Sequence, residues 1–155
     1  MNEFFGKSII SVRDLDKQKL ESIFDATNKI IDMGGDQRRE IARGKTLGYL
    51  FFEPSTRTRL SFEAAMALLG GTSIGIADVL SSSVHKGETL GDTVKIISSY
   101  CDVLALRHSL DGSSRFAAEV SNKPVINAGS GTEEHPTQTI QDLFTIRKEK
   151  KKIDG

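Results

Sequence analysis

The segment that decides the fold reads Phe51-Phe52-Glu53-Pro54-Ser55-Thr56-Arg57-Thr58-Arg59-Leu60-Ser61-Phe62-Glu63, because an apolar strand pattern changes within it to a helix pattern. Backbone N–H groups at a helix start have no intrahelical partner and carry the positive end of the helix dipole, so they attract anions. The hydroxyls of Ser55, Thr56 and Thr58 add donors, and the planar guanidinium of Arg57 suits phosphate oxygens. We therefore predict a phosphate-type anion site at the start of this helix.

Strand and helix patterns alternate along the chain on both sides of this segment. An amphipathic helix, capped by Asp14 or Asp16 and stopped by Gly34-Gly35, comes first, and the polar stretch 36–45 is expected to be a linker. Strands are expected at residues 47–52, 73–77, 103–106 and 125–128. Helices are expected to follow them at residues 56–69, 89–100, 113–120 and 136–148.

This strict alternation indicates an α/β fold, a doubly wound four-stranded parallel sheet with helices on both faces. In such sheets ligands bind beyond the carboxyl ends of the strands. All the segments at those ends are polar, so they are candidates for one shared crevice: residues 55–57, residues 81–88, Arg107-His108, and residues 129–135.

Composition narrows the function further. Lys plus Arg equals Asp plus Glu at 21 each in 155 residues, so no global charge recruits nucleic acid or an anionic membrane. No segment approaches the roughly 18 apolar residues of a membrane span, and we expect a cytoplasmic protein. Cys101 is the only cysteine, which excludes an internal disulfide and a thiolate zinc cluster, and we expect it to be a core residue.

Four spaced motifs together resemble the carbamoyl-phosphate domain of the aspartate transcarbamoylase family, over essentially the whole chain. The sister ornithine transcarbamoylases share the Ser-Thr-Arg-Thr-Arg core and the His-Pro-x-Gln motif, so the other motifs favour the aspartate branch. An ornithine-type domain and a non-catalytic module that binds carbamoyl phosphate stay as alternatives. The motifs are Phe52-Glu53-Pro54-Ser55-Thr56-Arg57-Thr58-Arg59, Lys86-Gly87-Glu88-Thr89, Arg107-His108 and His135-Pro136-Thr137-Gln138.

The resemblance implies the transfer of a carbamoyl group from carbamoyl phosphate to the amine of L-aspartate, as in pyrimidine biosynthesis. It implies that Ser55, Thr56, Arg57 and Thr58 bind the phosphate, and that Arg107 bridges the phosphate and the carbamoyl oxygen. Donors and cations placed at that oxygen stabilise the charge that grows on it as the amine attacks. The family reaction needs no covalent enzyme intermediate, and we expect no cofactor and no metal.

His135 resembles the residue that polarises the carbamoyl oxygen, to which Thr58 and Arg107 also donate, and Gln138 resembles the one that holds the carbamoyl NH2 group. We expect His135 to act as a neutral donor, because the cations nearby should disfavour an imidazolium and lower its pKa.

Ser82 and Lys86 match loop residues that reach the neighbouring subunit's site in this family, which implies a homotrimer with shared sites. Regulatory chains are further candidate partners. Val84 and His85 differ from the glycine and lysine expected there, so a role for His85 is less well supported than one for Lys86.

The family's chain is about twice as long as this one. We therefore expect residues 1–150 to be the carbamoyl-phosphate-binding domain and residues 151–155 to begin a linker to an aspartate-binding domain. Without that domain the chain alone should be inactive. Three features favour ordinary structural roles: Arg59 should point away from the anion, His108 should be structural, and the charge run 147–152 should be solvated.

Overall fold

The computed structural model describes residues 3–77, 86–132 and 134–151. Its strands are β1 (Thr46–Phe51), β2 (Thr72–Ile76), β3 (Val103–His108) and β4 (Val125–Ser130). Its helices are α1 (Lys17–Asp32), α2 (Gly35–Arg39), α3 (Thr56–Leu68), α4 (Leu90–Ser98), α5 (Ser113–Val120) and α6 (Pro136–Lys150), with a short 3₁₀ turn at Val12–Asp14.

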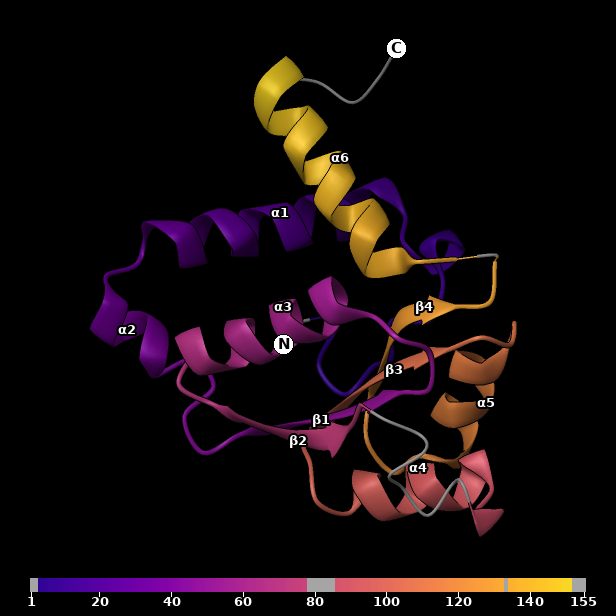
Figure 1. The fold of residues 1–155 in the computed structure, drawn as a ribbon. Helices are drawn as coiled ribbons and strands as arrows, with labels where there is room; N and C mark the ends of the chain where they lie inside the picture. Colours follow the sequence, from indigo (N-terminus) through magenta and orange to yellow (C-terminus); the bar gives the residue numbers. More distant parts are fainter. Residues whose placement is uncertain (1–2, 78–85, 133, 152–155) are drawn as a thin grey trace.

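The four strands form one parallel sheet in the order β2-β1-β3-β4, which confirms the predicted fold class. Helices α4 and α5 cover one face, while α1, α3 and α6 lie on the other (Figure 1). The strand order reverses between β1 and β3, where a doubly wound sheet leaves a crevice at the carboxyl ends of the strands.

Both faces of the sheet are packed. The apolar cluster under α4 and α5 includes the buried Cys101, as predicted, and burial raises the pKa of its thiol. On the other face Phe24 of α1 is fully buried, and its ring centroid lies 5.6 Å from that of Phe144 in α6. The main cluster consists of Leu50, Val94, Cys101, Leu104, Leu106, Ala117 and Val125.

The stretch 36–45 is not the linker that its polar composition predicted. It contains all but the first residue of α2, and also the buried Ala42, whose N–H donates to Leu69 O at 2.9 Å. Gly70 allows this packing: its φ is +84°, and a Cβ there would lie 1.8 Å from Arg39 O. The segment is therefore held by contacts with the end of α3, which local composition does not reveal.

The sheet also gains a short contact that the sequence pattern did not indicate. Ile9 forms a parallel bridge with Ile126 of β4: its N–H donates to Val125 O, and its carbonyl accepts from Asn127 N, both at 2.8 Å. This bridge places the segment before α1 beside the start of β4.

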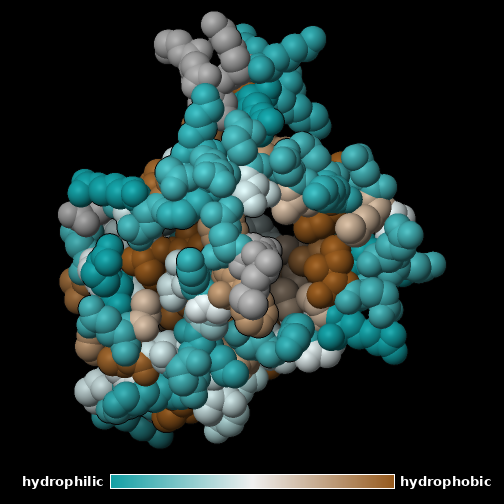
Figure 2. Space-filling model, turned by 180° about the vertical axis from the view of Figure 1, so that it is seen from behind, coloured by the Kyte–Doolittle hydropathy of each residue, from teal (hydrophilic) through white to brown (hydrophobic). Residues whose placement is uncertain are grey.

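The surface of the described chain agrees with the charge analysis. Hydrophilic residues cover the projecting end of α6, while hydrophobic patches gather beside a hollow in the face seen from behind (Figure 2). Lys148 to Lys151 are exposed, as predicted for a solvated charge run. The prediction was wrong for Arg147, which is only partly exposed: it forms an ion pair with Glu21, and its guanidinium lies 5.3 Å from the centroid of the Phe24 ring. Among the helices of residues 3–77, 86–132 and 134–151, none has the length and apolar character that crossing a bilayer requires.

Candidate active site

A polar cavity of about 790 Å³ opens at the carboxyl ends of the strands, where the strand order reverses. Three separate parts of the chain line it: the start of α3, the end of β3 and the start of α6. The lining residues are Pro54, Ser55, Thr56, Arg57, Thr58, Ser61, Arg107, His135, Thr137, Gln138 and Gln141.

The start of α3 offers hydrogen-bond donors that the helix itself does not use. Ser55 is the N-cap residue, but its side chain makes no capping hydrogen bond. The N–H groups of the first turn therefore face the cavity without a side-chain cap, and the Ser55 hydroxyl is left for a ligand. Arg59 turns away and bonds Glu63 Oε1 at 2.9 Å, as predicted, whereas Arg57 lines the cavity and is exposed.

Arg107 lies at an irregularity between β3 and β4. The strand register runs from Leu106↔Asn127 to His108↔Ser130, so β4 carries one extra residue opposite Arg107. Such a bulge re-aims the side chains near it. Arg107 donates from Nη1 to Ala128 O and from Nη2 to Glu53 Oε1, both at 3.3 Å, while its buried Nε has no hydrogen-bond partner.

Gly129 provides the room that Arg107 needs. Its φ is +117°, and a Cβ at this position would lie 2.7 Å from Arg107 Nη1 and 3.3 Å from His135 Cδ2. The missing side chain therefore lets a guanidinium and an imidazole from different elements approach the same backbone.

His135 caps α6 and presents its ring to the cavity. Its Nδ1 accepts the N–H of Gln138 at 3.4 Å, and proline follows at the first helical position. With Nδ1 accepting, the neutral ring carries its proton on Nε2. Burial lowers the pKa of His135, and the charge of Arg107 lowers it further. This is the predicted direction, but burial rather than neighbouring cations is the larger cause.

Gln138 is oriented by its own helix. Its Nε2 donates to Asp142 Oδ1 at 2.9 Å, and a carboxylate can only accept, so the Gln138 amide is anchored by its nitrogen end. The carbonyl Oε1 is then the atom that can accept from a ligand N–H.

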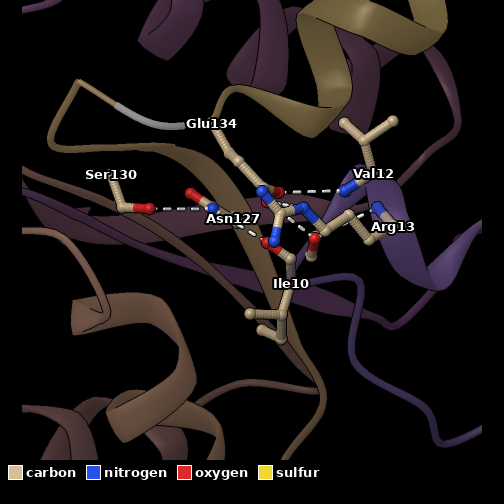
Figure 3. A network of polar contacts seen from close by, with 7 residues as sticks. Ile10, Val12, Arg13, Asn127, Ser130 and Glu134 are labelled. Atoms are coloured by element: carbon tan, nitrogen blue, oxygen red, sulfur yellow. Dashed lines mark hydrogen bonds and ion pairs between the residues drawn. The ribbon is translucent and has the colours of Figure 1, made fainter.

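A network of polar contacts joins the segment before α1 to β4 and to Glu134, the residue that precedes His135 (Figure 3). The Glu134 carboxylate accepts two hydrogen bonds: Oε1 accepts from Ser11 Oγ at 2.8 Å, and Oε2 accepts from Val12 N at 3.0 Å. Asn127 is buried and donates to Ile10 O at 2.9 Å and Ser130 Oγ at 3.0 Å. These bonds tie the segment before α1 to both ends of the β4–α6 turn.

The structure brings most of the predicted site residues to this one cavity. Lys86 is exposed and does not line it, and Ser82 lies outside the described residues. Sequence reasoning assigned no role to Ser61, Thr137 and Gln141. Ser61 lies four residues after Arg57 and Gln141 three residues after Gln138, so helical spacing would have placed these two beside the cavity, whereas Thr137 had no such signal. The predicted residues that do line the cavity are Ser55, Thr56, Arg57, Thr58, Arg107, His135 and Gln138.

The donor set suits an oxyanion. Arginine, hydroxyl and helix N-terminal N–H groups dominate the lining, and all of them donate hydrogen bonds. Within the described part of the chain, no group of three or more His, Cys, Asp or Glu side chains could hold a metal ion.

Comparison with known proteins adds a family match. Residues 7–148 match the family model described as aspartate/ornithine carbamoyltransferase, carbamoyl-P binding domain. The aspartate carbamoyltransferase catalytic subunit of Nitrosopumilus maritimus (strain SCM1) is 71% identical over 154 residues, which cover 99% of this chain and 50% of the relative. The aspartate carbamoyltransferase catalytic subunit of Thermoplasma acidophilum is 50% identical to this chain. The match covers 97% of this chain and 50% of that relative.

Solved structures agree in fold. The catalytic subunit of M. jannaschii aspartate transcarbamoylase superposes with a TM-score of 0.89 at 48% identity, over 96% of this chain and 49% of that chain. Aspartate transcarbamoylase from Trypanosoma cruzi, in complex with aspartate and phosphate, superposes with a TM-score of 0.88 at 38% identity. The match covers 97% of this chain and 48% of that chain. This chain therefore spans about half the length of the curated relatives it matches.

Proposed function

This chain belongs to the aspartate/ornithine carbamoyltransferase family, and we propose that it supplies the carbamoyl-phosphate half of an aspartate carbamoyltransferase active site. The reaction transfers a carbamoyl group to the amine of L-aspartate and releases phosphate. The observation that carries the proposal is the cavity itself, where donors from α3, β3 and α6 converge at the switch point of the sheet.

The phosphate would bind at the start of α3. Ser55, Thr56 and Thr58 offer hydroxyls and first-turn N–H groups, and Arg57 offers a guanidinium on the same turn. Arg107 would bridge phosphate and carbamoyl oxygens, a role supported by its half-buried side chain and its unpartnered Nε. A ligand there would compete with Glu53 for the Arg107 guanidinium.

The carbamoyl group would lie between α3 and the start of α6. When the amine attacks the carbamoyl carbon, negative charge grows on the carbamoyl oxygen, and donors fixed beforehand stabilise that charge. His135 Nε2–H, Thr58 and Arg107 are the donors we assign to it. Gln138 Oε1 would accept from the carbamoyl NH2 group, because Asp142 already takes the amide nitrogen.

Aspartate is the acceptor we favour over ornithine, because the relatives described above are named aspartate carbamoyltransferase catalytic subunits. An ornithine-type domain and a module that binds carbamoyl phosphate without turnover are the alternatives. We further propose that residues 1–150 form the carbamoyl-phosphate domain, that residues 151–155 begin the linker to an aspartate-binding domain, and that the enzyme works in the cytoplasm.

We also propose that Ser82 and Lys86 act in the site of a neighbouring subunit within a homotrimer. The exposed position of Lys86, outside the cavity of its own chain, supports this proposal. A cation there would complete the charge around a bound phosphate without crowding Arg57 and Arg107 within one chain.

Calorimetric titration with carbamoyl phosphate tests the site. Arg57→Ala should weaken binding by about 1.5–3 kcal/mol, the usual worth of hydrogen bonds to a charged group. Arg115→Ala is the control, because this exposed arginine of α5 does not line the cavity and its loss should leave binding unchanged. Equal affinities for wild type and Arg57→Ala would refute the assignment.

A further inference from the structure

A second, apolar groove of about 240 Å³ runs between α3 and α6 beside the polar cavity. Phe62 and Ala65 of α3 and Ile140 of α6 give it its carbon surface. Ser61, Thr137 and Gln141 line both the groove and the polar cavity, so the two spaces adjoin along a shared rim.

The groove begins where the anion donors end. With a rise of about 1.5 Å per residue, Phe62 lies roughly 6 Å and Ala65 roughly 10 Å further along the α3 axis than Thr58. An anion held at the first turn of α3 is therefore within reach of the groove through a chain of a few carbons.

The two spaces also differ in chemistry. The cavity is rich in donors such as Arg57 and Arg107, whereas the groove's own residues carry no polar side-chain atom. Burying hydrocarbon there is favourable because it removes apolar surface from water on both the ligand and the protein.

We propose that this groove is an apolar subsite of the anion cavity, and that it binds the hydrocarbon part of an organic phosphate or phosphonate whose oxyanion sits at the start of α3. The proposal rests on the proposed function, since it needs the phosphate position at Ser55 to Thr58. It extends that function by predicting that the site accepts anionic ligands with an apolar tail.

A phosphonate series tests the subsite in the 155-residue chain. Methylphosphonate measures the anion site alone, and propylphosphonate and 3-phenylpropylphosphonate add hydrocarbon that can reach the groove. A fully buried methylene contributes about fourfold in affinity, so 3-phenylpropylphosphonate should bind at least about tenfold more tightly than methylphosphonate. Calorimetry gives all three dissociation constants.

Variants on α3 locate the gain. Ala65→Gln places an amide in the groove and should remove most of the advantage of the long ligand while leaving methylphosphonate affinity unchanged. Ala64→Gln is the matched control, an exposed alanine one residue earlier that does not line the groove, and it should keep the advantage. Arg57→Ala should weaken the binding of all three phosphonates by a similar factor. That result would show that the oxyanion anchors the hydrocarbon tail.

Equal affinity for methylphosphonate and 3-phenylpropylphosphonate would overturn the subsite, and so would an advantage that survives Ala65→Gln. Failure of methylphosphonate itself to bind would instead count against the phosphate site. The two failures are therefore distinguishable.

Discussion

At the scale of single residues, His135 links the start of α6 to the chemistry we propose. Its Nδ1 accepts the Gln138 N–H, which leaves Nε2–H as the donor of the neutral ring. A proton on Nδ1 would break that cap and place a second charge near Arg107. Folding and the proposed function thus favour the same protonation state.

NMR titration of His135 in the unliganded protein should give a midpoint below about 6.5, because burial and then the charge of Arg107 lower its pKa. The unfolded chain then holds a proton that the folded chain lacks between the folded-state pKa and about 6.5. This group's contribution to stability should therefore rise with pH across that window. A midpoint above 6.5, or a neutral ring protonated on Nδ1, would contradict the assignment.

Gly129→Ala should weaken binding of carbamoyl phosphate as well as stability, because its Cβ would displace the Arg107 guanidinium. Gly112→Ala is the control that separates the backbone effect from the displacement of Arg107. Gly112 also has a positive φ of +75°, but nothing lies within 4 Å of the added Cβ. Both variants should lose stability, on the order of 1–3 kcal/mol for a left-handed backbone. Denaturant titration measures that loss and calorimetry the affinity. Unaltered affinity in Gly129→Ala would show that Arg107 does not need this space.

Much of the candidate site could be predicted because its residues follow strands directly. Ser55 to Thr58 come after β1 and Arg107 is the penultimate residue of β3, so the topology brings them together. Glu134 and Asn127 carried no such signal. The Glu134 partners Ser11 and Val12 and the Asn127 partner Ile10 lie more than 100 residues away in sequence, and only the folded chain shows those bonds.

At the scale of elements, the periodic segments were predictable and the contact-dependent ones were not. The four strands lie within two residues of their predicted bounds at either end, and α5 spans the predicted residues. Helix α2 was missed because five polar residues give no apolar period; it depends on Gly70 and the end of α3. The Ile9 bridge was missed for the same reason, since an isolated pair has no pattern of its own.

Helix α3 shows how one element serves both packing and site. Its first turn faces the cavity, and Arg59 bonds Glu63 one turn on, away from the ligand. Its later turns line the apolar groove with Phe62 and Ala65. The position of α3 on β1 and β2 therefore sets both the anion donors and the hydrocarbon surface.

At the scale of the whole molecule, site sharing can be tested by mixing two inactive variants of a longer chain that includes the proposed aspartate-binding domain. If each site takes Arg57 from one subunit and Lys86 from the next, a trimer that contains both Arg57→Ala and Lys86→Ala chains has one site free of both substitutions. Such hybrids should recover about a third of wild-type activity. Hybrids verified by mass that stay inactive would argue against sharing through Lys86.

The cavity also predicts what the 155-residue chain does alone. It should bind carbamoyl phosphate, because the donors at the start of α3, the end of β3 and the start of α6 are all present. It should form no measurable carbamoyl-aspartate, because orienting both reactants contributes roughly 7–11 kcal/mol to such a reaction, and we place aspartate recognition in a second domain.

Adding that domain as a separate polypeptide should restore turnover only where the two halves associate. An Arg57→Ala chain given the same partner is the control for residual background. The assay is carbamoyl-aspartate formation with and without the partner. Full activity from residues 1–155 alone would require an aspartate pocket within this chain, and the polar wall formed by Thr137 and Gln141 would then be the first place to look for it.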